Sequence, residues 1–280
     1  MRSLNKWLVY DVGLHKGEDT DFYLKKGFQV VAIEANPELI CECKERFRSR
    51  VASGDLRIIE GAIAPASAGN TVTFYKNVNV SIWGTIDPGW AERNAVRGHA
   101  SENIIVNRVD IVETFRAFGI PFYLKIDVEG ADKLVLESLE QFDERPQYIS
   151  IESDKVELSN VESELFALRE LGYSKYKVVQ QRSIPGTGIR AKAVNGRAFE
   201  HTFEECSSGP FGDDIAQPWL TIDEAIAAYR SIFVRYRYFG DRSLYTKLPR
   251  PAKGVISTIY KACTGHRGPL PGWYDTHASL

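Results

Sequence analysis

The residues of this chain best placed to do chemistry are carboxylates that follow short apolar runs. In an open parallel sheet the carboxyl ends of the strands share one edge, and that edge carries the ligand crevice. Like charges gathered at one place cost stability unless something uses them, so their convergence predicts a site. The carboxylates concerned are Asp11, Glu34, Glu60, Asp127 and Glu152.

A glycine loop follows the first of these carboxylates. The apolar run at 8–10 continues through Asp11, Gly13 and Gly17 into a segment with helical spacing. Gly13 can adopt backbone angles closed to other residues, and neither glycine has a side chain that would keep a ligand away from the main chain. The following helix points free N–H groups into the same space. The loop therefore predicts a ligand-binding turn, although the same pattern also occurs in ordinary strand-to-helix turns.

A second feature supports a nucleoside ligand. The apolar run at 29–33 ends at Glu34, about 20 positions past the glycine loop, and Asn36 and Pro37 then start another helix. A carboxylate at this place accepts two hydrogen bonds from the cis-diol of a ribose. The alternative is that Glu34 merely caps the helix after it.

The glycine spacing separates two classes of nucleoside cofactor. A dinucleotide fingerprint needs Gly-x-Gly-x-x-Gly, but the position two after Gly13 is His15. The seat for a pyrophosphate is therefore poor, which disfavours a nicotinamide-dinucleotide oxidoreductase. Asp11 at the loop entrance suits a cationic or amino-bearing ligand better. The combination points to S-adenosylmethionine, with a non-catalytic nucleoside-binding module as a further alternative.

Short apolar runs alternate with helical periods from residue 6 to about 179, which predicts an α/β fold with a parallel sheet covered by helices on both faces. The stretch 174–179 is expected to be the closing strand. The stretch 78–103 has no clear period and contains Trp83 and Trp90, which could stack on a sugar or merely pack. Beyond residue 180 the sequence is rich in Gly, Pro and Ser, and a capping box at Thr221 and Glu224 then starts a helix.

Charge and composition limit the partners. The formal net charge of −2 over 280 residues gives no reason to expect nucleic acid as a general partner. The charges from 229 to 267 are almost all positive, however, which indicates either a solvated face or a surface for an anionic substrate, carrier or lipid headgroup. We expect no secretion signal, no membrane span and no zinc-like or disulfide-like cysteine framework, and therefore a cytoplasmic enzyme.

Three motifs follow one another along the chain: Asp11-Val12-Gly13-(x)3-Gly17, Ile33-Glu34-Ala35-Asn36-Pro37 and Leu124-Lys125-Ile126-Asp127-Val128-Glu129-Gly130-Ala131-Asp132. Together they resemble the FkbM family of S-adenosylmethionine-dependent methyltransferases. The resemblance covers about residues 6–180 and implies the seven-stranded methyltransferase version of the Rossmann-like sheet, with the last strand antiparallel. It also implies methyl transfer to oxygen, commonly on sugars, glycans, lipids or secondary metabolites. Residues 1–180 would then form the methyltransferase domain, and residues 181–280 an extension packed on it that shapes the acceptor site.

The resemblance also implies roles in binding the cofactor. Asp11 and Gly13 would face the methionine moiety, and Glu34 would hold the ribose. Gly17 and Asp127 are also expected to bind the cofactor. Asn36 would support the ribose or the adenine. His15 would touch one of the two ligands or have no role. The residues expected near the adenine are Gly61 and Ala62.

Methyl transfer also requires removal of a proton from the acceptor, and a positioned base contributes about 10²–10⁴-fold to the rate. Asp127 and Glu129 end the strand that faces the methyl group, so one of them is the expected base. The alternative is architectural: Asp127 accepts backbone N–H bonds and Glu129 pairs with Lys125. No metal site is expected, because the spacing of the carboxylates does not establish one. The acceptor would be a small molecule or a glycan, with an anionic one among the candidates, and the oligomeric state stays open, a homodimer included.

Overall fold

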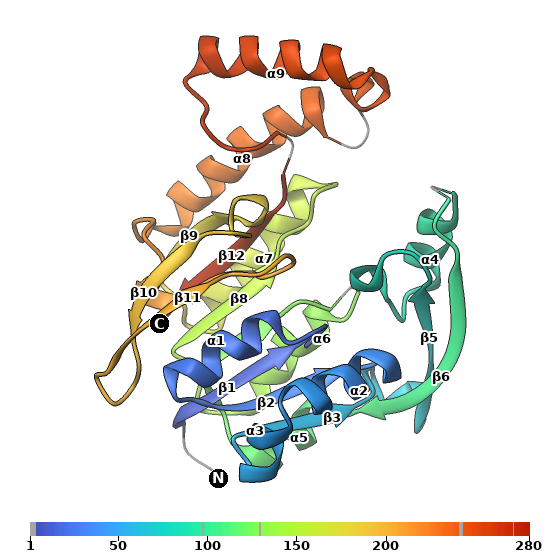
Figure 1. The fold of residues 1–280 in the computed structure, drawn as a ribbon, viewed down its shortest axis with the longest axis vertical. Coiled ribbons are helices and arrows are strands. Elements are labelled where there is room, and N and C mark those ends of the chain that lie inside the picture. The colour runs from blue at the N-terminus through green and yellow to red at the C-terminus, as the bar shows by residue number, and fades with distance from the viewer. Residues whose placement is uncertain (1–3, 97, 129, 241–242, 271) are drawn as a thin grey trace.

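The computed structural model describes residues 4–96, 98–128, 130–240, 243–270 and 272–280. Its centre is a seven-stranded sheet in the order β3-β2-β1-β7-β8-β12-β9 (Figure 1). The strands are β1 (Asn5–Val12), β2 (Gln29–Glu34), β3 (Leu56–Glu60), β7 (Pro121–Ile126), β8 (Tyr148–Glu152), β9 (Lys175–Gln180) and β12 (Tyr274–Ser279).

The central strands are apolar throughout because both faces of the sheet are covered. β1 pairs in parallel with β2 and with β7, so these three strands end side by side at one edge. Successive side chains of β1 enter different cores: Val9 packs on one face and Tyr10 on the other. The expected α/β, mostly parallel, seven-stranded sheet is confirmed.

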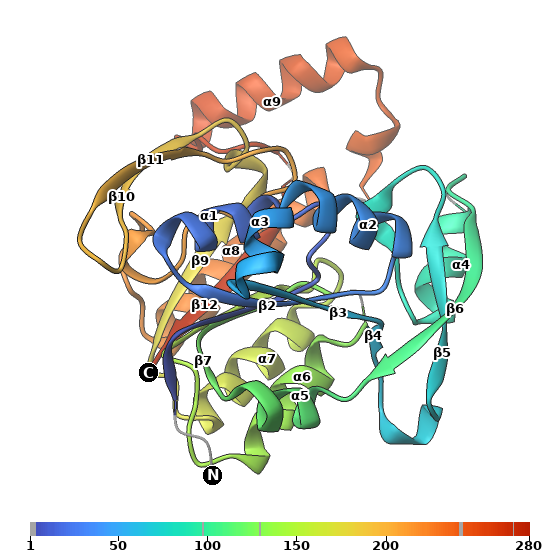
Figure 2. The ribbon, with the colours of Figure 1, turned by 60° about the horizontal axis from the view of Figure 1, so that its bottom comes forward.

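Helices cover the two faces as Figure 2 shows. One face carries α1 (Glu18–Lys26), α2 (Pro37–Arg46) and α3 (Arg48–Ser53). The opposite face packs against α5 (Ile111–Phe118), α6 (Asp132–Ser138), α7 (Leu158–Glu170) and α8 (Ile222–Phe239), whose apolar side chains join one large core. The predicted capping box starts α8, where the Thr221 hydroxyl accepts from the Glu224 N–H at 3.3 Å and the Glu224 carboxylate accepts from the Thr221 N–H at 2.8 Å.

The antiparallel strand of the sheet comes from the C-terminal part of the chain. β12 lies between β8 and β9 and runs antiparallel to both. The stretch 174–179, expected to close the sheet, forms β9 at its edge instead, and its direct partner is β12. Residues 1–180 therefore lack one strand of the sheet. The extension from 181 onward supplies that strand, which the resemblance, ending near 180, could not place.

A small sheet extends the fold beyond β3, and it accounts for part of the stretch that lacks a sequence period. Its order is β4 (Ala62–Ile63), β6 (Ser101–Val109) and β5 (Thr71–Asn77), with the 3-10 helix Ser81–Trp83 and α4 (Pro88–Val96) between β5 and β6. In Figure 1 this unit stands to one side of the main sheet, next to the ends of β2 and β3.

The extension covers the face that carries α1. Its hairpin, β10 (Gly188–Lys192) and β11 (Ala198–Thr202), leads into a loop whose Phe203 and Phe211 are buried in the same core as Tyr23 and Tyr123. The Phe211 ring stacks on Tyr123 with the ring centroids 4.0 Å apart. A further helix, α9 (Arg250–Thr264), follows α8 and stands apart from the sheet in Figure 1. Within the described residues, none of the helices combines the length and the apolar character needed to cross a bilayer.

Candidate active site

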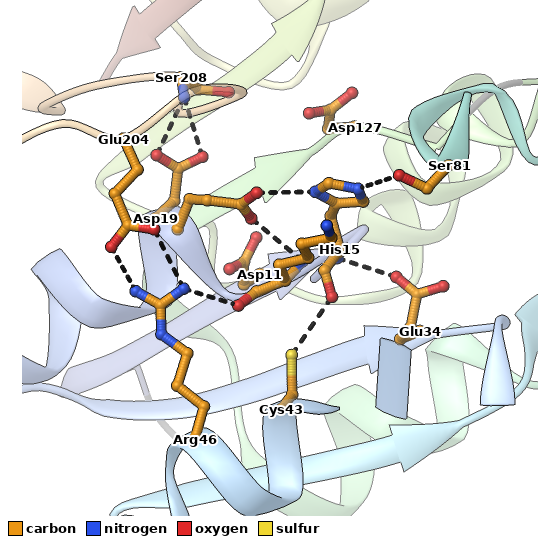
Figure 3. Close-up of polar contacts among 12 residues, drawn as sticks. Asp11, His15, Asp19, Glu34, Cys43, Arg46, Ser81, Asp127, Glu204 and Ser208 are labelled. Atoms are coloured by element: carbon orange, nitrogen blue, oxygen red, sulfur yellow. Dashed lines mark hydrogen bonds and ion pairs between the residues drawn. The ribbon is translucent and has the colours of Figure 1, made fainter. Parts of the chain in front are cut away.

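A pocket opens where β1, β2 and β7 end, at the edge predicted from the strand-end carboxylates (Figure 3). The loop after β1, the ends of β2 and β7, the small sheet and the extension all contribute to it. Six of the residues expected at the site line it together: Gly13, His15, Glu34, Gly61, Ala62 and Asp127.

Gly13 is required by a close approach of two chain segments. It has φ of +94°, and a Cβ atom at this position would lie 2.0 Å from the Asp127 carbonyl oxygen. The Gly13 N–H donates to the Ile33 carbonyl at 3.1 Å, which fixes the turn against the end of β2. A glycine here lets the exit of β1 lie directly against the exit of β7. The loop thus sets the position of the Asp127 backbone.

Glu34 is a buried carboxylate at the rim between two loops. One of its oxygens accepts from the His15 N–H at 2.9 Å, and the other accepts from the N–H groups of Ala35 and Asn36 at 2.9 and 2.8 Å. Burial raises the pKa of Glu34 above its ordinary value, although the three N–H groups act in the opposite direction. The N-cap of α2 is Asn36, whose side chain accepts from the Glu38 N–H at 3.0 Å, so the alternative of Glu34 as the cap is wrong.

His15 links the glycine loop to the small sheet. Its φ is +51°, a conformation that residues other than glycine rarely adopt. The ring bonds Glu18 through Nδ1 at 2.8 Å and the Ser81 hydroxyl through Nε2 at 2.7 Å. Cys206 of the extension lies beside this pair, and the ligand atoms of His15, Glu18 and Cys206 lie within 4.8 Å of one another. These three are the described residues that could hold a metal ion, although here the imidazole and the Glu18 carboxylate bond each other.

A buried lysine lies beneath the pocket. The Lys125 Nζ atom is 3.4 Å from Asp11, 3.3 Å from Asp19 and 3.2 Å from Asp127. Burial alone would lower the pKa of Lys125, but the three carboxylates raise it well above its ordinary value, so the ammonium stays charged. Burial raises the pKa of Asp11 to about 6, with Lys125 acting against it, and Asp11 also accepts from the Thr20 hydroxyl at 2.6 Å.

The extension is attached to this charged cluster. The Asp19 carboxylate accepts from the Ser208 N–H at 2.9 and 3.0 Å and from the Gly209 N–H at 3.3 Å. On the surface, Arg46 of α2 donates to Glu204 at 2.5 Å (Figure 3). Both contacts hold the loop that brings Cys206 into the pocket lining. The edge of the sheet that carries the pocket is therefore joined directly to the extension.

Asp127 differs from the other acids of the cluster because its side chain is 40% exposed, whereas those of Asp11 and Asp19 are buried. Its N–H donates to the Val12 carbonyl at 2.9 Å, so the backbone is fixed while the carboxylate is accessible. In Figure 3 it stands at the pocket without a bond to any other residue drawn. Glu129, the second expected base, lies outside the described residues.

Three of the residues expected to bind the cofactor lie outside the described pocket lining. Asp11 is fully buried behind it and engages Lys125, Gly17 is the N-cap of α1, and Asn36 caps α2. Asp11 therefore supports the site through Lys125 and does not face the pocket. Strand-end reasoning also missed several lining residues, of which only the acids in the first turn after the glycine loop gave a usable signal. The missed polar residues are Glu18, Asp19, Ser81, Thr85, Lys125 and Cys206.

The pocket fits a nucleoside that carries a positive charge. One part is apolar and could hold a planar base, with Leu39, Ile63, Phe74 and Ile86 in its lining. The other part carries the acids Glu18, Asp19 and Asp127, which favour an ammonium or sulfonium group over a phosphate. Between them the buried Glu34 carboxylate is placed for hydroxyl donors.

One comparison with known protein families agrees with this chemistry. The family model described as "Methyltransferase FkbM domain" matches residues 11–175. No curated protein sequence matches the chain. Solved structures with a similar chain include a SAM-dependent methyltransferase from Archaeoglobus fulgidus (12% identity, 99% of this chain and 87% of that chain, TM-score 0.39) and the precorrin-6y C5,15-methyltransferase from Geobacter metallireducens (11% identity, 72% and 77%, TM-score 0.37). An O-methyltransferase from Bacillus cereus is also similar (10% identity, 69% and 71%, TM-score 0.31).

At these identities and TM-scores, the solved structures assign neither an acceptor nor a reacting atom to this chain. The family match covers more than half of it and includes the glycine loop, the segment from Glu34 to Pro37 and the strand that ends at Asp127. The cofactor is S-adenosylmethionine. The chain belongs to the FkbM family of methyltransferases.

Proposed function

We propose that this methyltransferase acts on oxygen, on a hydroxyl group of a sugar, glycan, lipid or secondary metabolite, with Asp127 as the general base. The observation that carries the proposal is the contrast within the acid cluster. Asp11 and Asp19 are buried and engaged, whereas Asp127 is accessible in the pocket and has a fixed backbone. A hydroxyl is a poor nucleophile while it keeps its proton, so an accessible carboxylate is useful to an O-methyltransferase.

S-adenosylmethionine supplies an electrophilic methyl group, so the protein has to hold the two reactants in line and remove one proton. We assign Glu34 to the ribose hydroxyls, and Glu18 and Asp19 to the charged methionine end. Asp127 would accept the proton of the acceptor hydroxyl on a carboxylate oxygen as the new O–CH3 bond forms and the S–CH3 bond of the sulfonium breaks, with S-adenosylhomocysteine as the leaving group. Lys125, at 3.2 Å, orients that carboxylate.

The position of the extension supports a role for it in acceptor choice. Residues 203–212 run from the β11 hairpin over α1, and Cys206 in this loop lines the pocket beside His15. The acceptor would enter between this loop and the segment that joins β5 to β6, whose Ser81, Ile82 and Thr85 also belong to the lining. We therefore assign acceptor selection to these two elements and cofactor binding to the strand ends.

The atom that receives the methyl group tests the proposal of transfer to oxygen. Pooled sugars, glycans, lipids and secondary metabolites are incubated with the enzyme and S-adenosylmethionine labelled with ¹³C in the methyl group. The carbon shift of the product then identifies a methyl group on oxygen, nitrogen or carbon. We expect methoxy signals. A label found on nitrogen or carbon alone would overturn the assignment to oxygen.

The base is tested separately with Asp127→Asn. We expect the turnover number to fall about 10²–10⁴-fold, while the affinity for S-adenosylhomocysteine in calorimetry stays within about twofold. Asp55→Asn is the matched control, because the Asp55 side chain is also 40% exposed and lies outside the pocket lining. Normal turnover of Asp127→Asn would refute its role. NADH in the same calorimetry serves as a ligand that should not bind.

A further inference from the structure

The helix α9 leaves an apolar side exposed and contacts the rest of the protein through another side. At 100° per residue, Val255, Ile256 and Ile259 share one side of the helix, and their exposed fractions are 60, 39 and 57%. The contacts to the rest of the protein come from another side. Lys253 donates to the Thr246 carbonyl at 2.7 Å, and the Tyr260 ring lies 4.7 Å from that of Phe239.

More apolar surface lies nearby on the preceding segments. Leu244 is 78% exposed between α8 and α9, and Val234 and Tyr238 on α8 are 52 and 65% exposed. A helix of a water-soluble domain normally buries its apolar stripe. A contiguous patch of exposed apolar side chains marks a surface that binds another protein or a membrane. Single exposed side chains elsewhere, such as Trp7 on β1 or Phe166 on α7, lie on separate elements.

The net charge of residues 229–267 is opposite in sign to the net charge of the rest of the chain. Residues 229–267 contain nine arginines and lysines against one aspartate, although the whole chain has 35 basic and 37 acidic residues. The rest of the chain is therefore strongly acidic. Basic residues stand before, within and after α9, at Lys247, Arg250, Lys253, Lys261 and Arg267.

We propose that residues 243–267, which we call the basic arm, dock the protein on an anionic membrane surface, with Val255, Ile256 and Ile259 entering the headgroup boundary. An amphipathic helix rich in Lys and Arg, with an apolar side free to enter the interface, is the arrangement that binds there. Lysines and arginines near an anionic leaflet each add to the attraction. Pairing of the arm with the arm of a second copy would instead bring two strongly positive surfaces together.

The arm is placed so that docking would bring the catalytic edge to the surface. Its far end returns to the core where the Gln180 amide donates to the Pro269 carbonyl at 3.1 Å and to the Tyr274 hydroxyl at 3.0 Å. Gln180 and Glu152 are the last residues of β9 and β8, at the same edge as the pocket. Docking itself does not depend on the reaction assigned above.

The test is co-sedimentation of the full chain with vesicles of phosphatidylcholine alone and with vesicles that contain about 30% phosphatidylglycerol, which carry the negative surface potential. One variant combines Val255→Ser, Ile256→Ser and Ile259→Ser. A second combines Lys247→Gln, Arg250→Gln and Lys261→Gln. The matched control removes three positive charges elsewhere and combines Lys44→Gln, Arg48→Gln and Arg50→Gln, on α2 and α3.

We expect binding to the anionic vesicles alone, weakened by salt. The charge variant should lose about 100-fold in partition, at about fivefold per charge, and the apolar variant at least about tenfold, while the control triple keeps most of the binding. Equal binding to both vesicles, no binding, or an equal loss in the control would overturn the proposal. So would sedimentation velocity that shows a wild-type dimer abolished by the apolar variant. Calorimetry with S-adenosylhomocysteine on the same proteins tests the cofactor site separately. If the cofactor product does not bind, the result with vesicles still decides whether the basic arm docks on the membrane.

Discussion

Replacing Glu34 with glutamine tests the cofactor site with a change of one atom. The oxygen that accepts from both Ala35 and Asn36 is best kept as the amide oxygen, so the new NH2 group faces the His15 N–H, 2.9 Å from the present oxygen. That N–H then lacks an acceptor, at a cost of about 1–3 kcal/mol to the free energy of unfolding. The cofactor in turn loses a charged acceptor for its ribose hydroxyls, which costs about 2 kcal/mol of binding.

A loss of about 2 kcal/mol corresponds to a dissociation constant for S-adenosylhomocysteine about 30-fold higher. Calorimetry measures the affinity and urea unfolding measures the stability on the same sample. Glu60→Gln is the control, because Glu60 is the register neighbour of Glu34 on β3 but bonds Lys44 on the surface. If Glu34→Gln loses stability and binds S-adenosylhomocysteine as tightly as the wild type, Glu34 only supports the loop, and its assignment to the ribose is refuted.

Three further outcomes follow from the packing. Burial lowers the pKa of His277 to about 3, whereas a histidine in the unfolded chain titrates at about pH 6.5. Between pH 7 and pH 5 the unfolded chain therefore binds more protons, and the wild type should lose about 2 kcal/mol of stability that His277→Leu does not lose. Equal slopes of the free energy of unfolding against pH, measured with urea, would contradict this. Gly13→Ala should lower the melting temperature and weaken S-adenosylhomocysteine binding, since its Cβ would lie 2.0 Å from the Asp127 carbonyl oxygen; an unchanged melting curve would be unexpected. Asp19→Asn should expose the loop at Ser208 to limited proteolysis, and equal cleavage rates would show that the loop is held by other contacts.

The sequence predicts the part of the site that depends on local rules. An apolar run that ends in a carboxylate and a glycine specifies a strand, its exit and a turn, so Gly13, Glu34 and Asp127 could be placed at one edge without coordinates. The same rules did not reveal that Asp11 is fully buried outside the pocket lining. Its carboxylate bonds Thr20 and lies 3.4 Å from Lys125, which is 114 positions later in the chain and on the neighbouring strand. A pairing between distant residues leaves no local pattern in a single sequence.

The origin of the seventh strand was beyond local reasoning for a related cause. The segment 274–279 contains Asp275, Thr276 and His277, and all three are buried. This composition does not predict an interior strand, because Asp and Ala are depleted in strands and the segment has no run of large aliphatic residues. The segment forms a strand because it pairs with β8 on one side and with β9 on the other. These pairings are present only in the folded sheet. Thr276, for example, shares hydrogen bonds of 2.7 and 2.8 Å with the hydroxyls of Ser153 and Tyr229.

The position of β12 in the chain also bears on how the protein folds during synthesis. A ribosome releases β9 almost a hundred residues before it releases β12. The nascent chain therefore carries two unpaired strand edges while the β10–β11 hairpin, the loop 203–212 and the basic arm are made. Unpaired strand edges are templates for aggregation, and the pairing of strands so far apart in the sequence is slow. We therefore expect deletions from the C-terminal end to produce insoluble chains. Internal deletions that remove α9 and spare β12 should stay soluble.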